Sequence, residues 1–294
     1  MSTPTQPHEE PRSPPTATAT AGGGGHPQLV RAALGQAPWQ TIGVVGQAAL
    51  QIVLLGILAR KVSPAGFGLV AIANVSLGIA AIFAEVGLGS GVIQRQNLTI
   101  RHVRTVFTLT LVFGVVFFVV GLIVAPWIAA LFQEPAVTPV IRALTIVFAV
   151  TGVSQLAESL LQREMMLKRL MWARLAAWSL GYAPVGLALA WLDYGVWALV
   201  GATLAQVGLQ TGLMIWSQPY KLGLSFEWKA ARELLSFGFG LTLSRVLLFA
   251  GGQTDRLFIG RWLGSRLLGN YQLACQLVEV PARYNAQIVS AILY

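Results

Sequence analysis

Long apolar runs separated by short polar connections occupy the chain from residue 39 onward. A membrane-spanning helix needs about 20 predominantly apolar residues, whereas the strands of a membrane barrel alternate apolar and polar positions. Uninterrupted runs of this length therefore predict transmembrane helices. Eight spans are expected, over residues 39–59, 67–92, 105–131, 140–161, 171–192, 196–216, 237–263 and 267–294.

The composition agrees with an all-α, polytopic transmembrane helical bundle. Apolar residues make up 55% of the chain and charged residues 11%, whereas a soluble domain carries about 25% charged residues. A shortage of charge this deep indicates that most of the surface faces lipid.

The sequence divides into four predicted segments. Residues 1–38, rich in Pro, Thr, Ala and Gly, cannot bury a core and are expected to form a disordered cytoplasmic tail. Residues 39–216 hold a complete lobe of six helices, and the more polar residues 217–236 form an amphipathic cytoplasmic linker. Residues 237–294 begin a second lobe, which we expect to be incomplete because the sequence stops inside an apolar run.

The formal net charge is +9, but the basic residues form short clusters between apolar runs, which is typical of orientation signals and not of nucleic-acid binding. Twelve Lys and Arg residues fall on the side of the N-terminus and five on the opposite side, so a cytoplasmic N-terminus is predicted. The twelve are Arg12, Arg31, Arg95, Arg101, Arg104, Arg163, Lys168, Arg169, Arg174, Lys221, Lys229 and Arg232, and the five are Arg60, Lys61, Arg142, Arg261 and Arg266.

The titratable residues disfavour bond chemistry. A single cysteine, Cys275, excludes an internal disulfide and a Cys-based zinc site, and the three histidines are too scattered for a metal centre. A membrane glycosyltransferase or acyltransferase would need a positioned acid, base or metal, and the sequence has no D-x-D pair and no histidine within a span. We therefore predict a non-enzyme with no catalytic residue, metal or cofactor.

Charges inside the spans are the first candidates for substrate contact, because placing them in a membrane is costly. Arg245 and Arg256 are eleven residues apart, which puts them about 20° apart on one face of an ideal helix. Their side chains either contact a substrate or form structural ion pairs. Asp255 is a candidate to neutralise a neighbouring arginine.

The acidic residues of the spans are candidates for coupling or ion pairing. Glu279 and Arg283 are four residues apart, the spacing of an ion pair within a helix. Glu85 and Glu158 lie toward the cytoplasmic ends of their spans, where they either reach the wet interface or couple transport to a proton or cation.

Glutamines recur at helical spacing in three spans. They are Gln47 and Gln51 in the first span, Gln155 and Gln162 with Glu158 in the fourth, and Gln206 and Gln210 in the sixth. Hydrogen bonding between helices is one interpretation. The other is a hydrated central cavity in which Gln47, Gln51 and Gln155 bind substrate. Trp39, Trp127, Trp191 and Trp216 lie near span ends and are interpreted as interface anchors.

An internal repeat links the first and seventh spans. Residues 57–60 (ILAR), continuing through Phe67-Gly68 to Ile72-Ala73, align without gaps on residues 258–261 (FIGR), continuing through Leu268-Gly269 to Leu273-Ala274. The offset is 201 residues, or six spans. Because six is even, the two copies run in the same direction, as in two lobes related by an axis along the membrane normal.

The sequence around this repeat resembles a known family. The strings ILAR (57–60), SPAGFGLV (63–70), FAEVGLG (83–89) and VIQR (92–95) resemble, in order, the Wzx-type polysaccharide and lipopolysaccharide O-unit flippases. These belong to the multidrug/oligosaccharidyl-lipid/polysaccharide exporter superfamily. The later strings DRLFIGR (255–261) and LGNY (268–271) are similar to the opening of that family's second lobe.

The resemblance covers residues 36–294 and implies a two-lobed transporter that moves undecaprenyl-diphosphate-linked oligosaccharides outward by alternating access. It implies a multi-pass protein of the bacterial inner membrane whose partners are the lipid-linked oligosaccharide, the bilayer and, as further candidates, polysaccharide polymerases. A drug or peptidoglycan-precursor exporter of the same superfamily and a non-functional fragment stay open as alternatives.

Overall fold

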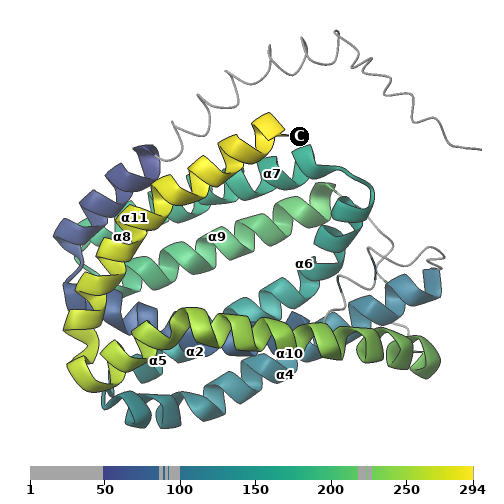
Figure 1. Cartoon of the computed structure of the whole chain (residues 1–294), viewed down its shortest axis with the longest axis horizontal. Helices are drawn as coiled ribbons and strands as arrows, with labels where there is room; N and C mark the ends of the chain where they lie inside the picture. The colour runs from purple at the N-terminus through teal and green to yellow at the C-terminus, as the bar shows by residue number, and fades with distance from the viewer. Residues whose placement is uncertain are drawn as a thin grey trace, which may run out of the picture.

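The computed structural model describes residues 49–85, 89, 92, 100–217, 223 and 227–293, without the side chains of residues 85, 167, 228–242 and 280–293. Within this part of the chain the regular elements are helices joined by short turns (Figure 1). The predicted all-α fold is therefore confirmed. The first span is helical over residues 49–61.

Each later span corresponds to one helix or to consecutive helices. The first group consists of α2 (Pro64–Glu85), α4 (Ile100–Phe132), α5 (Val137–Leu144), α6 (Ile146–Arg163), α7 (Leu167–Ala176), η1 (Ala177–Tyr182), α8 (Ala183–Trp191) and α9 (Val196–Ser217). They are followed by α10 (Trp228–Phe258), η2 (Ile259–Leu263) and α11 (Gly264–Leu293). Among the described residues, α2, α4, the α5–α6 pair and α9 are long and apolar enough to cross a membrane. The protein is thus membrane-embedded.

The helix α10 begins inside the segment that the sequence assigns to the linker. The sequence predicts a short amphipathic helix within residues 217–236 and a separate seventh span from residue 237, but one helix runs from Trp228 to Phe258. The polar and apolar parts share a helix because no proline or tight-turn sequence separates them.

A π-helical turn, η1, interrupts the fifth span directly before Pro184. Proline has no N–H to donate to the carbonyl four residues earlier. The wider i→i+5 bonding of a π turn, here from the N–H of Ala183 to the carbonyl oxygen of Trp178, is a local adjustment that accommodates a proline in a membrane helix. A Cβ on Gly181 would lie 3.0 Å from the carbonyl oxygen of Ala205. The widened turn therefore packs its backbone directly on α9.

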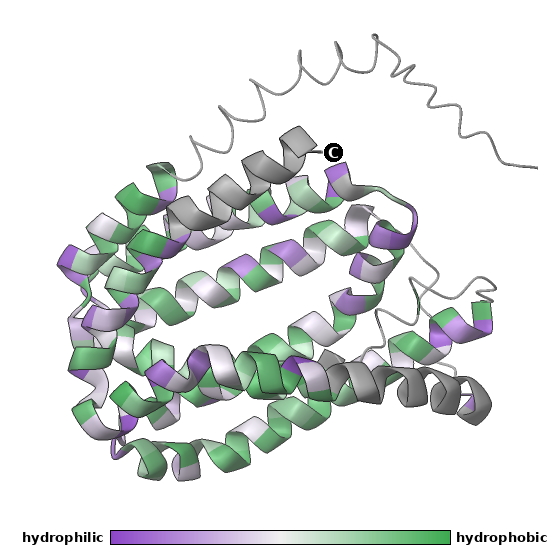
Figure 2. Ribbon diagram, in the orientation of Figure 1, coloured by the Kyte–Doolittle hydropathy of each residue, from purple (hydrophilic) through white to green (hydrophobic). Residues whose placement is uncertain are grey.

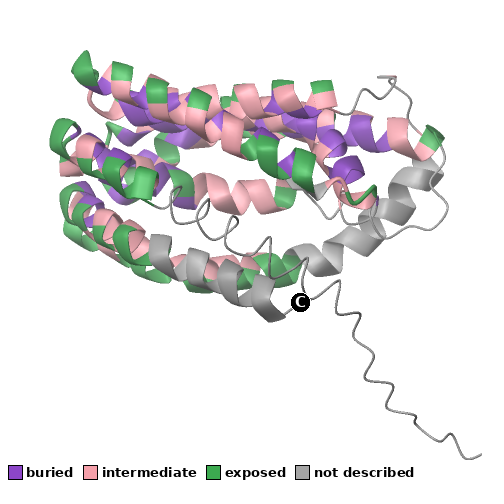
Figure 3. Ribbon diagram, turned by 90° about the horizontal axis from the view of Figure 1, so that it is seen from above, coloured by how far each residue is buried: buried purple, intermediate pink, exposed green. Residues whose placement is uncertain are grey.

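The core of the described bundle lies among α2, α4, α5 and α9. Its fully buried side chains include Ile72, Ile141 and Leu144, and Leu268 of α11 joins the same cluster. Figure 3 shows the buried residues concentrated in this part of the bundle, with α10 and α11 along its lower edge. Three of the four predicted interface tryptophans are exposed near helix ends (Trp127, Trp191 and Trp216), and Trp39 lies outside the described residues.

The two groups of loops that the charge count separates lie at opposite ends of the helices. At one end, Lys61 Nζ lies 3.7 Å from Asp193 Oδ1, which joins the turns after the first and fifth spans. At the other end, Arg169 donates a hydrogen bond of 3.4 Å to the carbonyl oxygen of Ser217. Figure 2 shows polar residues gathered near these ends and apolar residues along most of α4 between them. Which end faces the cytoplasm stays a prediction.

We expect a periplasmic reporter signal at Asp193 and a cytoplasmic one at Lys168, because the basic residues favour the side of Lys168. Alkaline phosphatase and green fluorescent protein fusions at each position measure the two signals. A fusion at Lys61 serves as the control, since this residue lies at the same end as Asp193. Cytoplasmic fluorescence from the Asp193 fusion would show that the predicted orientation is inverted.

A reciprocal pair of glycines forms the crossing of α2 and α11. A Cβ on Gly68 would lie 1.8 Å from the carbonyl oxygen of Ser265, and a Cβ on Gly269 would lie 1.7 Å from the carbonyl oxygen of Pro64. Gly68 and Gly269 are 201 residues apart, and so are Pro64 and Ser265. Exchanged contacts of this kind are what a two-fold relation between equivalent segments produces. This crossing agrees with the division of the chain into two lobes, which stays a prediction.

Candidate functional site

Two polar cavities lie among the described helices, and four of the predicted site residues line them: Gln155 and Glu158 the first, Gln51 and Glu279 the second. The first, of about 210 Å³, lies between α2, α4, α6 and α9. The second, of about 260 Å³, lies between residues 49–61, η1, Tyr182 and α11. The glutamines that the sequence would place in one central cavity are therefore separated, because α6 and α9 face each other while Gln51 faces α11.

The first cavity forms where small residues bring α4 and α6 close together. A Cβ on Gly114 would lie 2.6 Å from the carbonyl oxygen of Phe148, and a Cβ on Gly152 would lie 2.7 Å from that of Thr110. Small residues at both positions permit this approach. Both glycines also line the cavity. The polar side chains of Gln155 and Glu158, which follow Gly152 on α6, line the same cavity.

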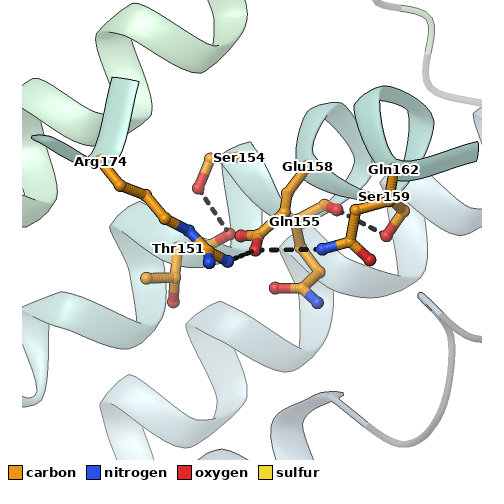
Figure 4. A network of polar contacts seen from close by, with 7 residues as sticks. All are labelled: Thr151, Ser154, Gln155, Glu158, Ser159, Gln162 and Arg174. Atoms are coloured by element: carbon orange, nitrogen blue, oxygen red, sulfur yellow. Dashed lines mark hydrogen bonds and ion pairs between the residues drawn. The ribbon is translucent and has the colours of Figure 1, made fainter. Parts of the chain in front are cut away.

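Gln155, Glu158 and Gln210 line this first cavity, so two of the three predicted glutamine stripes meet there. Glu158 forms an ion pair with Arg174 of α7, and Gln162 donates a hydrogen bond of 3.4 Å to Glu158 Oε1. Figure 4 shows the side chains of Arg174 and Gln162 both directed at this carboxylate. Glu158 thus has a cationic partner, and its role in coupling stays a prediction.

Some polar residues of the first cavity also join its helices. The hydroxyl of Thr211 on α9 donates a hydrogen bond of 3.2 Å to the hydroxyl of Ser154 on α6, and both residues are buried. Hydrogen bonds between membrane helices contribute about 0.6 kcal/mol on average. From the sequence, hydrogen bonding between helices and the lining of a cavity are alternative roles for the polar residues of the spans. On α6 the two roles occur together.

The second cavity has a polar wall on α11. Gln272, Gln276 and Glu279 occupy positions i, i+4 and i+7 and all line the cavity. Gln51 lines it from the opposite helix, residues 49–61, together with three leucines. The amide groups can donate and accept hydrogen bonds, whereas the carboxylate only accepts them.

Aromatic rings form another wall of the second cavity. Trp178 and Tyr182 both line it, and their ring centroids are 6.5 Å apart with planes inclined by 12°. The two residues lie within the π turn η1, in the middle of the fifth span. Aromatic anchors of the membrane interface lie near span ends, so these two residues are not anchors of that kind. Both rings also pack against the buried cluster that includes Leu54 and Leu58.

A largely buried cation lies beside the second cavity. Arg256 Nη2 is 2.8 Å from Glu279 Oε1, and the arginine side chain is 14% exposed. Gln253 accepts a further hydrogen bond from this guanidinium. Asp255 instead accepts hydrogen bonds from the hydroxyl of Tyr271 and from the backbone N–H of Arg256. The carboxylate paired with the Arg256 side chain is thus Glu279, which comes from the next helix.

The other predicted residues occupy different surroundings. Arg245 is exposed, whereas Arg256 is largely buried, so their shared helical face does not give them a common environment. Gln47 and the side chains of Glu85 and Arg283 lie outside the described residues. Their proposed roles, including the Glu279–Arg283 pair, stay predictions.

The polar and aromatic residues of the second cavity include two glutamines and two aromatic residues that were not singled out from the sequence. Gln272 and Gln276 have the same i, i+4 spacing that marks the glutamines of the earlier spans. Trp178 and Tyr182 carry a signal of their own, because they lie in the middle of a span. Neither signal indicates that these two faces, 90 or more residues apart in sequence, meet at one cavity.

The chain matches the model of the polysaccharide biosynthesis protein family over residues 57–294. It belongs to this family. The match confirms the resemblance noted in the sequence.

Several curated proteins are similar to the chain. It is 26% identical to the teichuronic acid biosynthesis protein TuaB of Bacillus subtilis, over 91% of the chain and 56% of that protein. It is 24% identical to the lipopolysaccharide biosynthesis protein WzxC of Escherichia coli, over 88% of the chain and 53% of that protein. It is 26% identical to the succinoglycan biosynthesis transport protein ExoT of Rhizobium meliloti, over 87% of the chain and 51% of that protein. The chain thus spans about half the length of these relatives. No solved structure matches it significantly.

Proposed function

We propose that the protein is a flippase that moves undecaprenyl-diphosphate-linked oligosaccharides across the bacterial inner membrane and performs no bond chemistry. The observation that carries this proposal is the polar cavity between residues 49–61 and α11, with the guanidinium of Arg256 beside it. A substrate of this kind needs hydrogen-bonding groups for its sugars and a cation for its diphosphate. Membership of the polysaccharide biosynthesis family supports the same conclusion.

The arrangement of α2, α10 and α11 supports an alternating-access mechanism. The helices α10 and α11 diverge from their shared turn (Figure 1), and α2 crosses α11 close to that turn. Glu134, in the turn between α4 and α5, accepts hydrogen bonds from Ser265 Oγ at 2.6 Å and from the Ser265 N–H at 3.3 Å. We infer that these contacts close the predicted periplasmic end, and that transport requires them to open.

Export in a strain that lacks its own flippase tests this function. The protein, expressed in this strain, should restore surface polysaccharide. We further propose that Arg245, eleven residues before Arg256 on α10, offers a second cation to the diphosphate at another point of its path. Arg245→Ala should then lose most of this export and Arg245→Lys should keep part of it, because lysine retains the charge that attracts a diphosphate but not the bidentate geometry of arginine. Surface polysaccharide is measured per amount of protein in the membrane.

The matched control is Arg142→Ala, which removes an exposed arginine at the opposite, predicted periplasmic end. This variant should export as the parent does. Normal export by well-expressed Arg245→Ala would rule out the role of this residue. Failure of the parent protein to export any polysaccharide, while it restores resistance to a drug, would favour the drug exporter of the same superfamily.

A further inference from the structure

The aromatic and polar walls of the second cavity combine two kinds of group that a sugar ring requires. Trp178 and Tyr182 line the cavity from η1 with their rings nearly parallel to each other. A pyranose has apolar C–H faces that pack on aromatic rings, which offer large apolar surfaces with a negative face. Its equatorial hydroxyls point outward from the ring edge and need donors and acceptors.

The polar wall supplies these donors and acceptors. Gln51, Gln272 and Gln276 each offer an amide that donates and accepts, and Glu279 offers a carboxylate that accepts from hydroxyls. The volume of about 260 Å³ is just below the range of about 300–1,000 Å³ that is usual for small-molecule pockets. The cavity therefore suits a single ring and not an extended chain.

The position of the cation fixes how a substrate would lie. Glu279 lines the cavity and also pairs with Arg256 at 2.8 Å. The guanidinium of Arg256 is therefore separated from a sugar ring in the cavity by the side chain of Glu279. In a lipid-diphosphate-linked glycan, the first sugar is joined directly to the diphosphate. A first sugar in the cavity would thus place its diphosphate next to Arg256.

We propose that the cavity between η1 and α11 is a subsite for the first sugar of the substrate, with Trp178 as its stacking platform. The subsite rests on the proposed flippase function and adds the part of the substrate that is recognised and the residues that recognise it. The π turn η1 has a role in this subsite, because it holds Trp178 and Tyr182 at the cavity while its backbone packs on α9. Such turns are frequent at functional sites.

Binding of matched probes to the protein in lipid nanodiscs tests the subsite. The probes are farnesyl diphosphates that carry glucose, galactose or N-acetylglucosamine, and farnesyl diphosphate without a sugar. The parent should bind at least one sugar-bearing probe about tenfold more tightly than the sugar-free probe. Trp178→Leu should reduce this preference to within about twofold and leave the affinity for the sugar-free probe unchanged, which also shows that the variant is folded.

Two further variants separate stacking from packing. Trp178→Phe keeps an aromatic face and should keep most of the preference. Trp172→Leu removes an exposed tryptophan of α7, two turns away on the same span, and should bind every probe as the parent does. A Trp178→Leu variant that weakens all four probes equally would show a purely structural role and overturn the subsite.

The result for the subsite is distinguishable from the result for the flippase function. Equal binding of all four probes, or no binding, by a protein that restores polysaccharide export would overturn the subsite and leave the flippase function standing. A clear sugar preference in a protein that exports no polysaccharide would support the subsite and count against the flippase.

Discussion

Gly269→Ala should destabilise the protein by about 3 kcal/mol, because its new methyl group would meet the backbone of α2. The Cβ would lie 1.7 Å from the carbonyl oxygen of Pro64. A flexible side chain could move aside from such a contact, but a helix backbone cannot do so without separating α2 from α11. Gly68→Ala should have an effect of similar size, since its Cβ would lie 1.8 Å from the carbonyl oxygen of Ser265.

The double variant provides a sharper test of the crossing. Once one methyl group has separated the helices, the second meets less resistance, so Gly68→Ala/Gly269→Ala should cost less than the two single changes together. Unfolding by sodium dodecyl sulfate in mixed micelles measures each free energy. Gly251→Ala is the control, because no atom beyond the neighbouring backbone of its own helix lies within 4 Å of its added Cβ. This change should be neutral or stabilise the helix by up to about 1 kcal/mol. Equal stability of Gly269→Ala and the control would contradict the observed crossing.

Glu279→Leu should destabilise the protein by about 2 kcal/mol, because it leaves the guanidinium of Arg256 without its carboxylate. The arginine side chain is 14% exposed and the glutamate side chain 47% exposed. Removing the more exposed partner leaves the more buried charge alone, so Glu279→Leu should cost more than Arg256→Met. The double variant Arg256→Met/Glu279→Leu should lie within about 1 kcal/mol of the parent, since the buried guanidinium is removed together with the carboxylate it pairs with.

A second ion pair in the same molecule gives the matched control. Glu158→Leu removes a carboxylate from Arg174, whose side chain is 53% exposed. The exposed guanidinium of Arg174 can be hydrated once its partner is removed, so this change should cost less than about 1 kcal/mol in pairing energy. The same micelle titration measures all four variants. Equal losses from Glu279→Leu and Glu158→Leu would show that burial of Arg256 does not govern the strength of its pair.

The sequence by itself determined that this is a helical membrane protein and which family it belongs to. Runs of about 20 apolar residues leave a membrane-spanning chain no option but helices, since each backbone polar group must be satisfied within its own segment. The repeat of 201 residues indicated which segments are equivalent. Helical spacing also placed Gln155, Glu158 and Gln162 on one face, and the structure shows these three side chains close together.

Only the tertiary structure decided which helical faces meet. Spacing shows that Gln51 belongs to a polar stripe, but it cannot show that Trp178 and Gln276 line the same cavity, because contacts between distant segments depend on packing. The same limit applies to Glu279, for which the sequence suggests a partner four residues away on its own helix. The structure pairs it with Arg256, twenty-three residues earlier, because the chain turns at η2 and the two side chains reach each other across the angle between α10 and α11. For Gly68 and Gly269, the sequence predicts that the two positions correspond in a repeat, but only the structure shows that they meet at the close crossing of two backbones.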